Sequence, residues 1–200
     1  MNVKIHDSSI TGANNLGGMC YENRGNIKNC SVTESTISGK ASTGGLVSYA
    51  YDGSLISESY SLGPVDGKYH VGGLVAIGHG HILNCYSHSP TTSTTTDSRY
   101  GTGSLVGRAY SRSRIDYSYG TGLVSANNKL GGLIGICDSG SKVVKSCWDR
   151  FTTGQYQDCS NAISLFTGPM QHEETYSGWD FDNVWAIDEG ESYPYLKSQQ

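Results

Sequence analysis

The chain of 200 residues contains 27 Gly, 28 Ser and 15 Thr but only 4 Pro, with 36% hydrophobic and 16% charged residues. Its formal net charge of −4 and its 14 Lys and Arg provide too little positive charge for a nucleic-acid-binding surface. No stretch of about eighteen apolar residues is present and the glycines follow no Gly-X-Y period, so neither a membrane-spanning helix nor collagen is expected. The 14 Tyr supply enough ordering side chains for a folded, turn-rich chain.

A Gly-Gly-Leu-Val pattern recurs five times along the chain. The copies lie at residues 17–20, 44–47, 72–75, 103–106 and 131–134. Successive copies are 27, 28, 31 and 28 residues apart. The longest step contains a Thr-rich and Ser-rich run at residues 90–98, which is predicted to be a loop inserted into one repeat. Repeats of this length that tolerate an insertion are typical of stacked structural units.

A second pattern of four residues alternates with the first. It occupies residues 27–30, 56–59, 82–85, 115–118 and 144–147, with Ile or Val first and Cys or Ser fourth. Both patterns are too short for helices and lack a 3.6-residue period, so each repeat is expected to contribute two short strands. Such strands bury their side chains only by stacking about 4.8 Å apart on identical strands. The sequence therefore predicts an all-β fold, a parallel β-solenoid (β-helix) of about five coils.

Two places in the repeat are predicted to require unusual backbone geometry. The first and fourth residues of the second pattern both face the interior only if the chain bends at the third residue. Asn29 and Asn84 occupy that place, and Asn tolerates the left-handed conformation that such a bend requires. The first glycine of each Gly-Gly pair is expected either to adopt a positive φ or to occupy a corner too tight for a Cβ atom.

The cysteines are placed by the repeats. Cys30, Cys85 and Cys147 take the fourth place of alternate coils, roughly 10 Å apart. A disulfide needs Cα atoms within about 7 Å, so this column cannot cross-link itself, and we expect thiols packed in the interior. Two bridges within single coils remain as alternatives, Cys20 with Cys30 and Cys137 with Cys147, because each pair is ten residues apart.

These patterns resemble the GLUG-motif repeats of bacterial surface and secreted proteins. The resemblance rests on the Gly-Gly-Leu-Val copies and on Ile-x-Asn-Cys-Tyr-Ser at residues 82–87. The segments 147–149, 177–181 and 184–187 resemble the closing module that often follows such repeats. The resemblance extends over roughly residues 12–197. It implies an adhesin-like β-solenoid and brings no catalytic residue with it.

The chain is expected to have two parts, GLUG-like β-solenoid repeats at residues 1–150 and a C-terminal capping module at residues 151–200. The second part does not repeat and is rich in aromatic residues. These are Phe151, Phe166, Trp179, Phe181, Trp185, Tyr193 and Tyr195. An open solenoid end invites pairing with further strands, so this module is predicted to cover the fifth coil. Upstream repeats of a longer chain are expected to continue the first coil.

One column of aromatic residues is the candidate binding site. Tyr60, Tyr86, Tyr119 and Trp148 each follow the fourth place of the second pattern. A side chain that follows an inward-facing residue points outward, so these four are predicted to form a ladder along one outer face. Such a ladder either stacks on itself or binds the rings of a glycan or the surface of a partner protein, and both interpretations stay open.

Other groups carry weaker signals for chemistry. His79, His81 and His88 form the best metal-like cluster, but they surround a Gly-rich turn that is expected to be solvated. Five acidic residues near the C-terminus resemble glycosidase pairs only in composition. They are Asp180, Asp182, Asp188, Glu189 and Glu191. Because the chain also lacks a Gly-x-Ser-x-Gly elbow and a phosphate-binding loop, we predict no enzymatic activity, catalytic residue, bound metal or cofactor.

The predicted function is that of a structural and adhesive repeat segment of an exported bacterial surface protein. The segment is expected to be a rigid spacer about 24 Å long, from five coils at about 4.8 Å, and a contact surface for a surface glycan or protein. Residues 1–15 contain no signal peptide, so a larger exported precursor is expected, extracellular or at the cell surface. The alternatives are a carbohydrate-active β-helix enzyme and an accessory module of a secreted peptidase.

Overall fold

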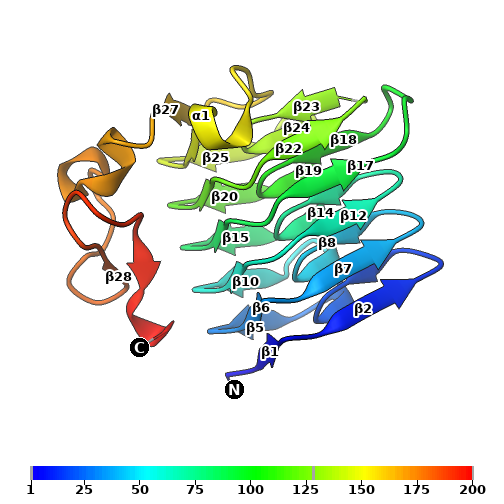
Figure 1. Ribbon diagram of the computed structural model, residues 1–200, viewed down its shortest axis with the longest axis horizontal. Helices are drawn as coiled ribbons and strands as arrows, with labels where there is room; N and C mark the ends of the chain where they lie inside the picture. Colours follow the sequence, from blue (N-terminus) through cyan, green and yellow to red (C-terminus); the bar gives the residue numbers. More distant parts are fainter. Residues whose placement is uncertain (1, 128, 200) are drawn as a thin grey trace.

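The computed structural model describes residues 2–127 and 129–199 and shows a parallel β-solenoid (Figure 1). Five coils stack on one another, and each contributes five short strands that pair in parallel with the strands of neighbouring coils. The predicted all-β solenoid of about five coils is therefore confirmed. The expectation of two strands per coil is wrong, because the polar stretches between the two patterns also form strands. No helix among the described residues is long and apolar enough to cross a membrane.

The strands form five sheets, numbered here in the order in which the chain enters them. Sheet 1 contains β1 (Lys4–His6), β6 (Ser31–Thr33), β11 (Tyr60–Ser61), β16 (Tyr86–Ser87), β21 (Tyr119–Gly120), β26 (Cys147–Asp149) and β27 (Ile163–Leu165). Sheet 2 contains β2 (Ser9–Gly12), β7 (Thr36–Gly39), β12 (Val65–Gly67), β17 (Thr91–Ser93) and β22 (Val124–Ala126). Sheet 3 contains β3 (Leu16–Gly17), β8 (Thr43–Gly44), β13 (Val71–Gly72), β18 (Gly101–Gly103) and β23 (Lys129–Gly131).

The remaining two sheets complete each coil. Sheet 4 contains β4 (Cys20–Asn23), β9 (Val47–Ala50), β14 (Val75–Gly78), β19 (Val106–Ala109) and β24 (Ile134–Cys137). Sheet 5 contains β5 (Asn26–Lys28), β10 (Leu55–Ser57), β15 (His81–Leu83), β20 (Arg114–Asp116) and β25 (Lys142–Val144). The C-terminal elements are α1 (Arg150–Thr153), the 3-10 helices η1 (Pro169–Gln171), η2 (Glu173–Thr175) and η3 (Lys197–Gln199), and the antiparallel pair β28 (Trp185–Ala186) and β29 (Tyr195–Leu196).

Each Gly-Gly-Leu-Val copy forms the corner between sheets 3 and 4. A Cβ atom on Gly72 would lie 2.0 Å from the carbonyl oxygen of Val75, and one on Gly44 would lie 2.1 Å from that of Val47. Neither glycine has a positive φ. Of the two explanations for the first glycine, the tight corner is therefore correct.

A left-handed residue bends each coil between sheets 5 and 1. The five residues are Asn29 (φ 53°), Glu58 (46°), Asn84 (52°), Tyr117 (47°) and Lys145 (45°). The bend predicted at Asn29 and Asn84 is confirmed. Its consequence is visible at Ile56 and Ser59, which lie on either side of Glu58 and are both fully buried.

The fifth coil is aligned one residue away from the predicted position. Val143 rather than Val144 takes the first place of the second pattern, and Ser146 takes the fourth. Cys147 consequently lies opposite Tyr119 and outside the inner Cys and Ser column. The sequence alone permits both alignments, because the two valines are equivalent and both Ser and Cys fit the fourth place.

The inner Cys and Ser column is held by hydrogen bonds between coils. The Ser59 hydroxyl accepts a hydrogen bond from the Cys30 amide at 3.1 Å, and the Ser118 hydroxyl accepts one from the Cys85 amide at 3.0 Å. The buried hydroxyls therefore have partners, as buried polar groups require. Burial raises the pKa of Cys85 to about 12, so this cysteine stays an uncharged thiol.

The Thr-rich run is only partly an inserted loop. Thr91 pairs with Val65 on one side and Val124 on the other, so the start of the run is the sheet 2 strand β17. The extra residues lie between β17 and β18. The predicted insertion is therefore correct in kind but begins later than residue 90.

Replacing the corner glycine tests the packing argument. We expect Gly72→Ala to lower the free energy of unfolding by about 2–3 kcal/mol, because its Cβ would overlap backbone atoms that cannot move independently. Gly25→Ala is the matched control, since no atom lies within 4 Å of a Cβ at that position. Urea unfolding followed by circular dichroism measures both variants, and equal losses would contradict the tight-corner explanation.

Candidate functional site

The C-terminal segment, residues 166–199, packs against the side of the solenoid rather than over its end (Figure 1). Five of its side chains are buried in one cluster with the tyrosine column of sheet 1. They are Met170, Tyr176, Trp179, Trp185 and Leu196. The module predicted at residues 151–200 therefore has two parts: residues that include Asp158 and β27 close the end of the fifth coil as expected, whereas the segment 166–199 covers the side of the stack. The apolar side chains of this segment bury the outer face of sheet 1, which is apolar where the tyrosines stack.

Three of the four predicted ladder residues do stack. The rings of Tyr60 and Tyr86 are 4.9 Å apart and almost parallel, and those of Tyr86 and Tyr119 are 5.2 Å apart. Trp148 is not part of this column, because the shifted alignment places it opposite Gly120. Its indole belongs to the interior cluster and donates a hydrogen bond to the carbonyl oxygen of Gln155 at 3.0 Å.

The tyrosine column is not an exposed face. Tyr60, Tyr86 and Tyr119 are 8%, 2% and 0% exposed, and Trp148 is 4% exposed. The Tyr119 hydroxyl donates to the carbonyl oxygen of Pro194 at 2.5 Å, within the segment that covers it. Desolvation raises the pKa of both Tyr86 and Tyr119. The expected outward exposure of these four residues is therefore wrong, and their role in this structure is internal packing.

Asp149, at the end of β26, joins the C-terminal segment to sheet 1. The carboxylate is fully buried, and its Oδ1 caps α1 by accepting hydrogen bonds from the Phe151 and Thr152 amides at 2.8 and 3.2 Å. Its Oδ2 accepts from the hydroxyls of Thr167 and Tyr193, each at 2.6 Å. Burial and the bond to Asp149 raise the pKa of Tyr193 to about 12.

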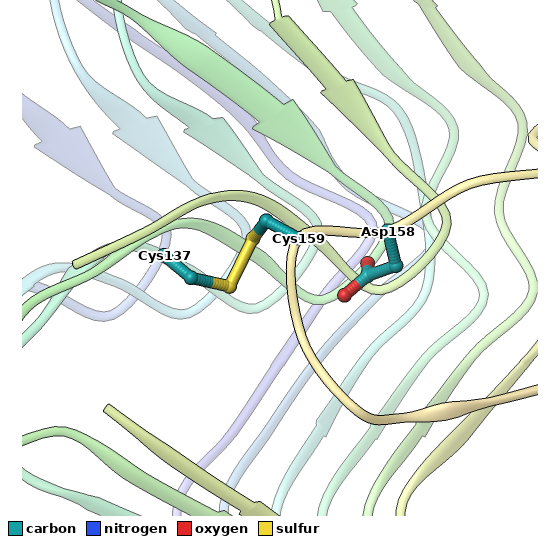
Figure 2. A group of neighbouring side chains, drawn as sticks. All are labelled: Cys137, Asp158 and Cys159. Carbon is teal, nitrogen blue, oxygen red and sulfur yellow. A yellow bond between two sulfur atoms is a disulfide. The ribbon is translucent and has the colours of Figure 1, made fainter. Parts of the chain in front are cut away.

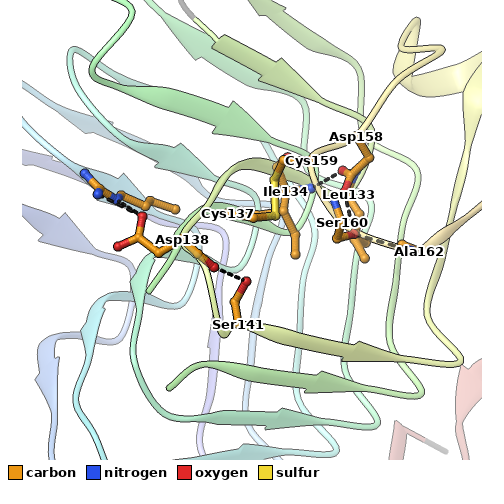
Figure 3. Close-up of a disulfide and its surroundings, with 10 residues drawn as sticks. Leu133, Ile134, Cys137, Asp138, Ser141, Asp158, Cys159, Ser160 and Ala162 are labelled. Carbon is orange, nitrogen blue, oxygen red and sulfur yellow. Dashed lines mark hydrogen bonds and ion pairs between the residues drawn. A yellow bond between two sulfur atoms is a disulfide. The ribbon is translucent and has the colours of Figure 1, made fainter. Parts of the chain in front are cut away.

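A second carboxylate closes the end of the stack. In the middle of the solenoid the carbonyl oxygen of Leu105 accepts hydrogen bonds from the amides of Leu74 and Val75. The corresponding amides of the last coil, on Leu133 and Ile134, instead donate to Oδ2 of Asp158 at 2.7 and 2.6 Å (Figure 3). Asp158 thus supplies the acceptor that a sixth coil would have provided.

A disulfide fixes this closing segment to the last coil. Cys137, at the end of β24, is bonded to Cys159, and their Cα atoms are 5.5 Å apart (Figure 2). The alternative bridge between Cys137 and Cys147 is therefore wrong, as is the one between Cys20 and Cys30, since those two cysteines are thiols. Cys159 lies outside both repeated patterns, so its pairing could not be predicted from the coil spacing.

The structure assembles no metal site from the predicted histidines. His79 bonds to the Tyr49 hydroxyl, His81 to Asp116, and His88 to the Tyr119 hydroxyl. Among the described residues, the one close group of three metal-binding types is Cys137, Asp158 and Cys159 (Figure 2). Its two sulfur atoms are bonded to each other and its carboxylate accepts backbone hydrogen bonds, so the group is structural as it stands.

The fold and its closed end define a capped parallel β-solenoid. No protein-family model and no curated protein matches the chain. A solved structure named IgA1 protease is similar at 24% identity and a TM-score of 0.65, and the match covers 80% of this chain and 14% of that one. A proposed immunoglobulin A1 protease from Bacteroides ovatus is similar at 16% identity and a TM-score of 0.60, covering 98% of this chain and 76% of that one. These matches show a shared fold.

Removing the closing carboxylate should loosen the last coil. We expect Asp158→Ala to cost about 2–3 kcal/mol of unfolding free energy, because two buried amides lose their acceptor. Hydrogen exchange at the Leu133 and Ile134 amides should accelerate, as measured by NMR. Asp182→Ala, which changes an exposed carboxylate, is the control. Unchanged exchange at both amides in the Asp158 variant would refute the closing role.

The lateral packing of the C-terminal segment can be tested separately. Trp185 is fully buried, with its ring 6.2 Å from that of Tyr86 and 6.1 Å from that of Tyr119. We expect Trp185→Ala to lower the unfolding free energy by about 3–5 kcal/mol and to speed proteolysis within residues 166–199. Phe151→Ala, at a side chain that is 76% exposed, should change stability by less than about 0.5 kcal/mol. Similar proteolysis of both variants would count against the packing.

Proposed function

We propose that this chain is a non-catalytic repeat module, of the GLUG type, from an exported bacterial protein, with structural and adhesive roles. The observation that carries the proposal is that two carboxylates and the disulfide have structural roles. Asp149, Asp158 and the bridge between Cys137 and Cys159 all fasten the chain to the solenoid. None of them lines an open groove in which a substrate would meet a reactive group.

The arrangement of carboxylates supports a non-catalytic module over the carbohydrate-active enzyme. Glycosidases need two carboxyl groups about 5–10 Å apart across the substrate. In the strand pairs of the described residues no carboxylate lies opposite another, and Asp66 faces Ser38 and Thr92. In the C-terminal segment, Asp180 accepts from Asn183 within its own turn. Asp180 therefore serves local structure.

The disulfide supports export. Disulfides persist in oxidising compartments and are rare where cytosolic reductants act. The bridge between Cys137 and Cys159 links the last coil to a segment that does not repeat. We therefore retain the extracellular or cell-surface location as part of the proposal.

The path of the chain disfavours an in-line spacer. After β27 the C-terminal segment returns along the side of the stack toward the end at which the chain begins (Figure 1). The two ends of the described chain thus do not lie at opposite ends of the five coils. We propose a module that presents its outer surface, in place of one that separates its neighbours by its own height.

Binding without cleavage is the expected behaviour. The similar structures are named as immunoglobulin A1 proteases, so immunoglobulin A1 is the first probe for an accessory or adhesive module. We expect the protein to bind immobilised immunoglobulin A1 or a glycan on an array, and to leave the immunoglobulin intact on a denaturing gel, with immunoglobulin G as the control. Cleavage would overturn the non-catalytic assignment. Absence of binding to either probe would overturn the adhesive one.

A further inference from the structure

A hollow on the outer surface is produced by one short turn. The turns that join sheet 4 to sheet 5 contain four residues in the second and fourth coils, at 51–54 and 110–113. In the third coil the same turn contains two residues, His79 and Gly80. The two longer turns flank the shorter one, and the hollow between them has a volume of about 350 Å³. We call it the short-turn notch.

An ion pair spans this notch. Arg112, from the fourth coil, donates from Nη1 to Oδ2 of Asp52 in the second coil at 2.6 Å. The two side chains are 78% and 54% exposed, so the pair is solvated and contributes little to stability. The Arg112 guanidinium can therefore leave Asp52 and bind an anionic ligand with a small loss of stability.

Basic side chains line the side of the notch formed by sheet 5. His81 and Arg114 lie opposite each other in neighbouring strands and both line the notch, whereas Lys142, opposite Arg114 in the next coil, lies outside it. The buried carboxylate of Asp116 orients the first two, accepting from Arg114 Nε at 2.5 Å and bonding His81 Nε2 at 3.0 Å. Half of the Arg114 side chain remains exposed, so its guanidinium has donors left for a ligand.

The floor of the notch contains His79, which is held by its neighbours. The ring of His79 is stacked between Tyr49 and Tyr110, with centroids 5.2 and 4.1 Å away, and its Nε2 is bonded to the Tyr49 hydroxyl. Desolvation lowers the pKa of His79, so the cationic groups at the notch are Arg112 and Arg114, each of which is paired with a carboxylate. Both ring faces are covered, and the ring therefore offers its edge rather than a stacking platform.

From this geometry we propose that the short-turn notch binds the oxyanion of an acidic sugar, either a carboxylate or a sulfate ester, between Arg112 and Arg114. Planar guanidinium groups bind such oxyanions with strong, charge-assisted hydrogen bonds. A small polar ligand fits better than a peptide, because the notch is made of turns and offers neither a free strand edge nor an apolar groove. The inference goes beyond the proposed function, since the notch would bind its ligand whether or not the module is adhesive.

Titration calorimetry of the whole protein at low salt tests the site. The probes are glucuronate, glucose 6-sulfate, glucose and N-acetylglutamate amide. We expect the two charged sugars to bind and glucose not to bind, and the relative affinity of the two will identify the preferred oxyanion. Glucose binding as well as glucuronate would overturn the proposal. The same conclusion would follow if neither charged sugar binds, or if N-acetylglutamate amide binds as tightly as they do.

A matched pair of arginine variants locates the site. Arg112→Gln should weaken binding of the preferred charged sugar at least roughly tenfold, through loss of a charge-assisted contact. Arg99→Gln is the control, because Arg99 is 79% exposed and likewise paired with a carboxylate, Asp97, but does not line the notch. Equal effects of the two substitutions would show that binding depends on general charge and would overturn the assignment. Both changes are at solvated ion pairs, so each variant is expected to fold.

Discussion

Stacked coils depend on backbone hydrogen bonds that run from one coil to the next. At the Gly-Gly corner two successive amides share one carbonyl oxygen of the following coil, as Leu74 and Val75 share that of Leu105. Every coil therefore needs a successor, and the last coil has none. Unpaired buried amides are costly and open strand edges invite association, so the end of the stack requires an acceptor from outside the repeat. Asp158 meets that need with a single carboxylate oxygen.

The outer face of sheet 1 also has apolar side chains that must be buried. Stacked tyrosines on sheet 1 present an apolar face that the repeat itself cannot cover. The C-terminal segment covers it with Trp179, Trp185 and neighbouring side chains. Asp149 takes part in both closures. Its Oδ1 caps the start of α1, and its Oδ2 accepts hydrogen bonds from the hydroxyls of Thr167 and Tyr193 in the C-terminal segment. Closure of the end and of the side thus starts at the same strand, β26.

Sequence periodicity was sufficient for the features that recur in every coil. The tight corner at Gly72 requires glycine, which all five copies have, and the left-handed bend carries Asn in two of the five coils, at Asn29 and Asn84, so both features leave a signal in the sequence. It was insufficient where the repeat ends. A one-residue ambiguity between Val143 and Val144 was enough to place Trp148 on the wrong face, because a strand alternates its side chains with period two. Asp158 and the partner of Cys137 lie beyond the last copy, where no neighbouring coil defines their position.

The short-turn notch illustrates how such a fold can acquire a binding site without disturbing its core. Shortening the turn at His79 leaves the strand register unchanged, since Ile77 still lies opposite Arg108 and His81 opposite Arg114. The interior of a solenoid is fixed by contacts above and below each residue, whereas its turns contact mainly solvent and each other. Differences in turn length between neighbouring coils therefore create hollows at no cost to stacking. In this chain the short-turn notch is lined by both Arg112 and Arg114, which is why the turns rather than the buried tyrosine column are the better place to look for ligand recognition.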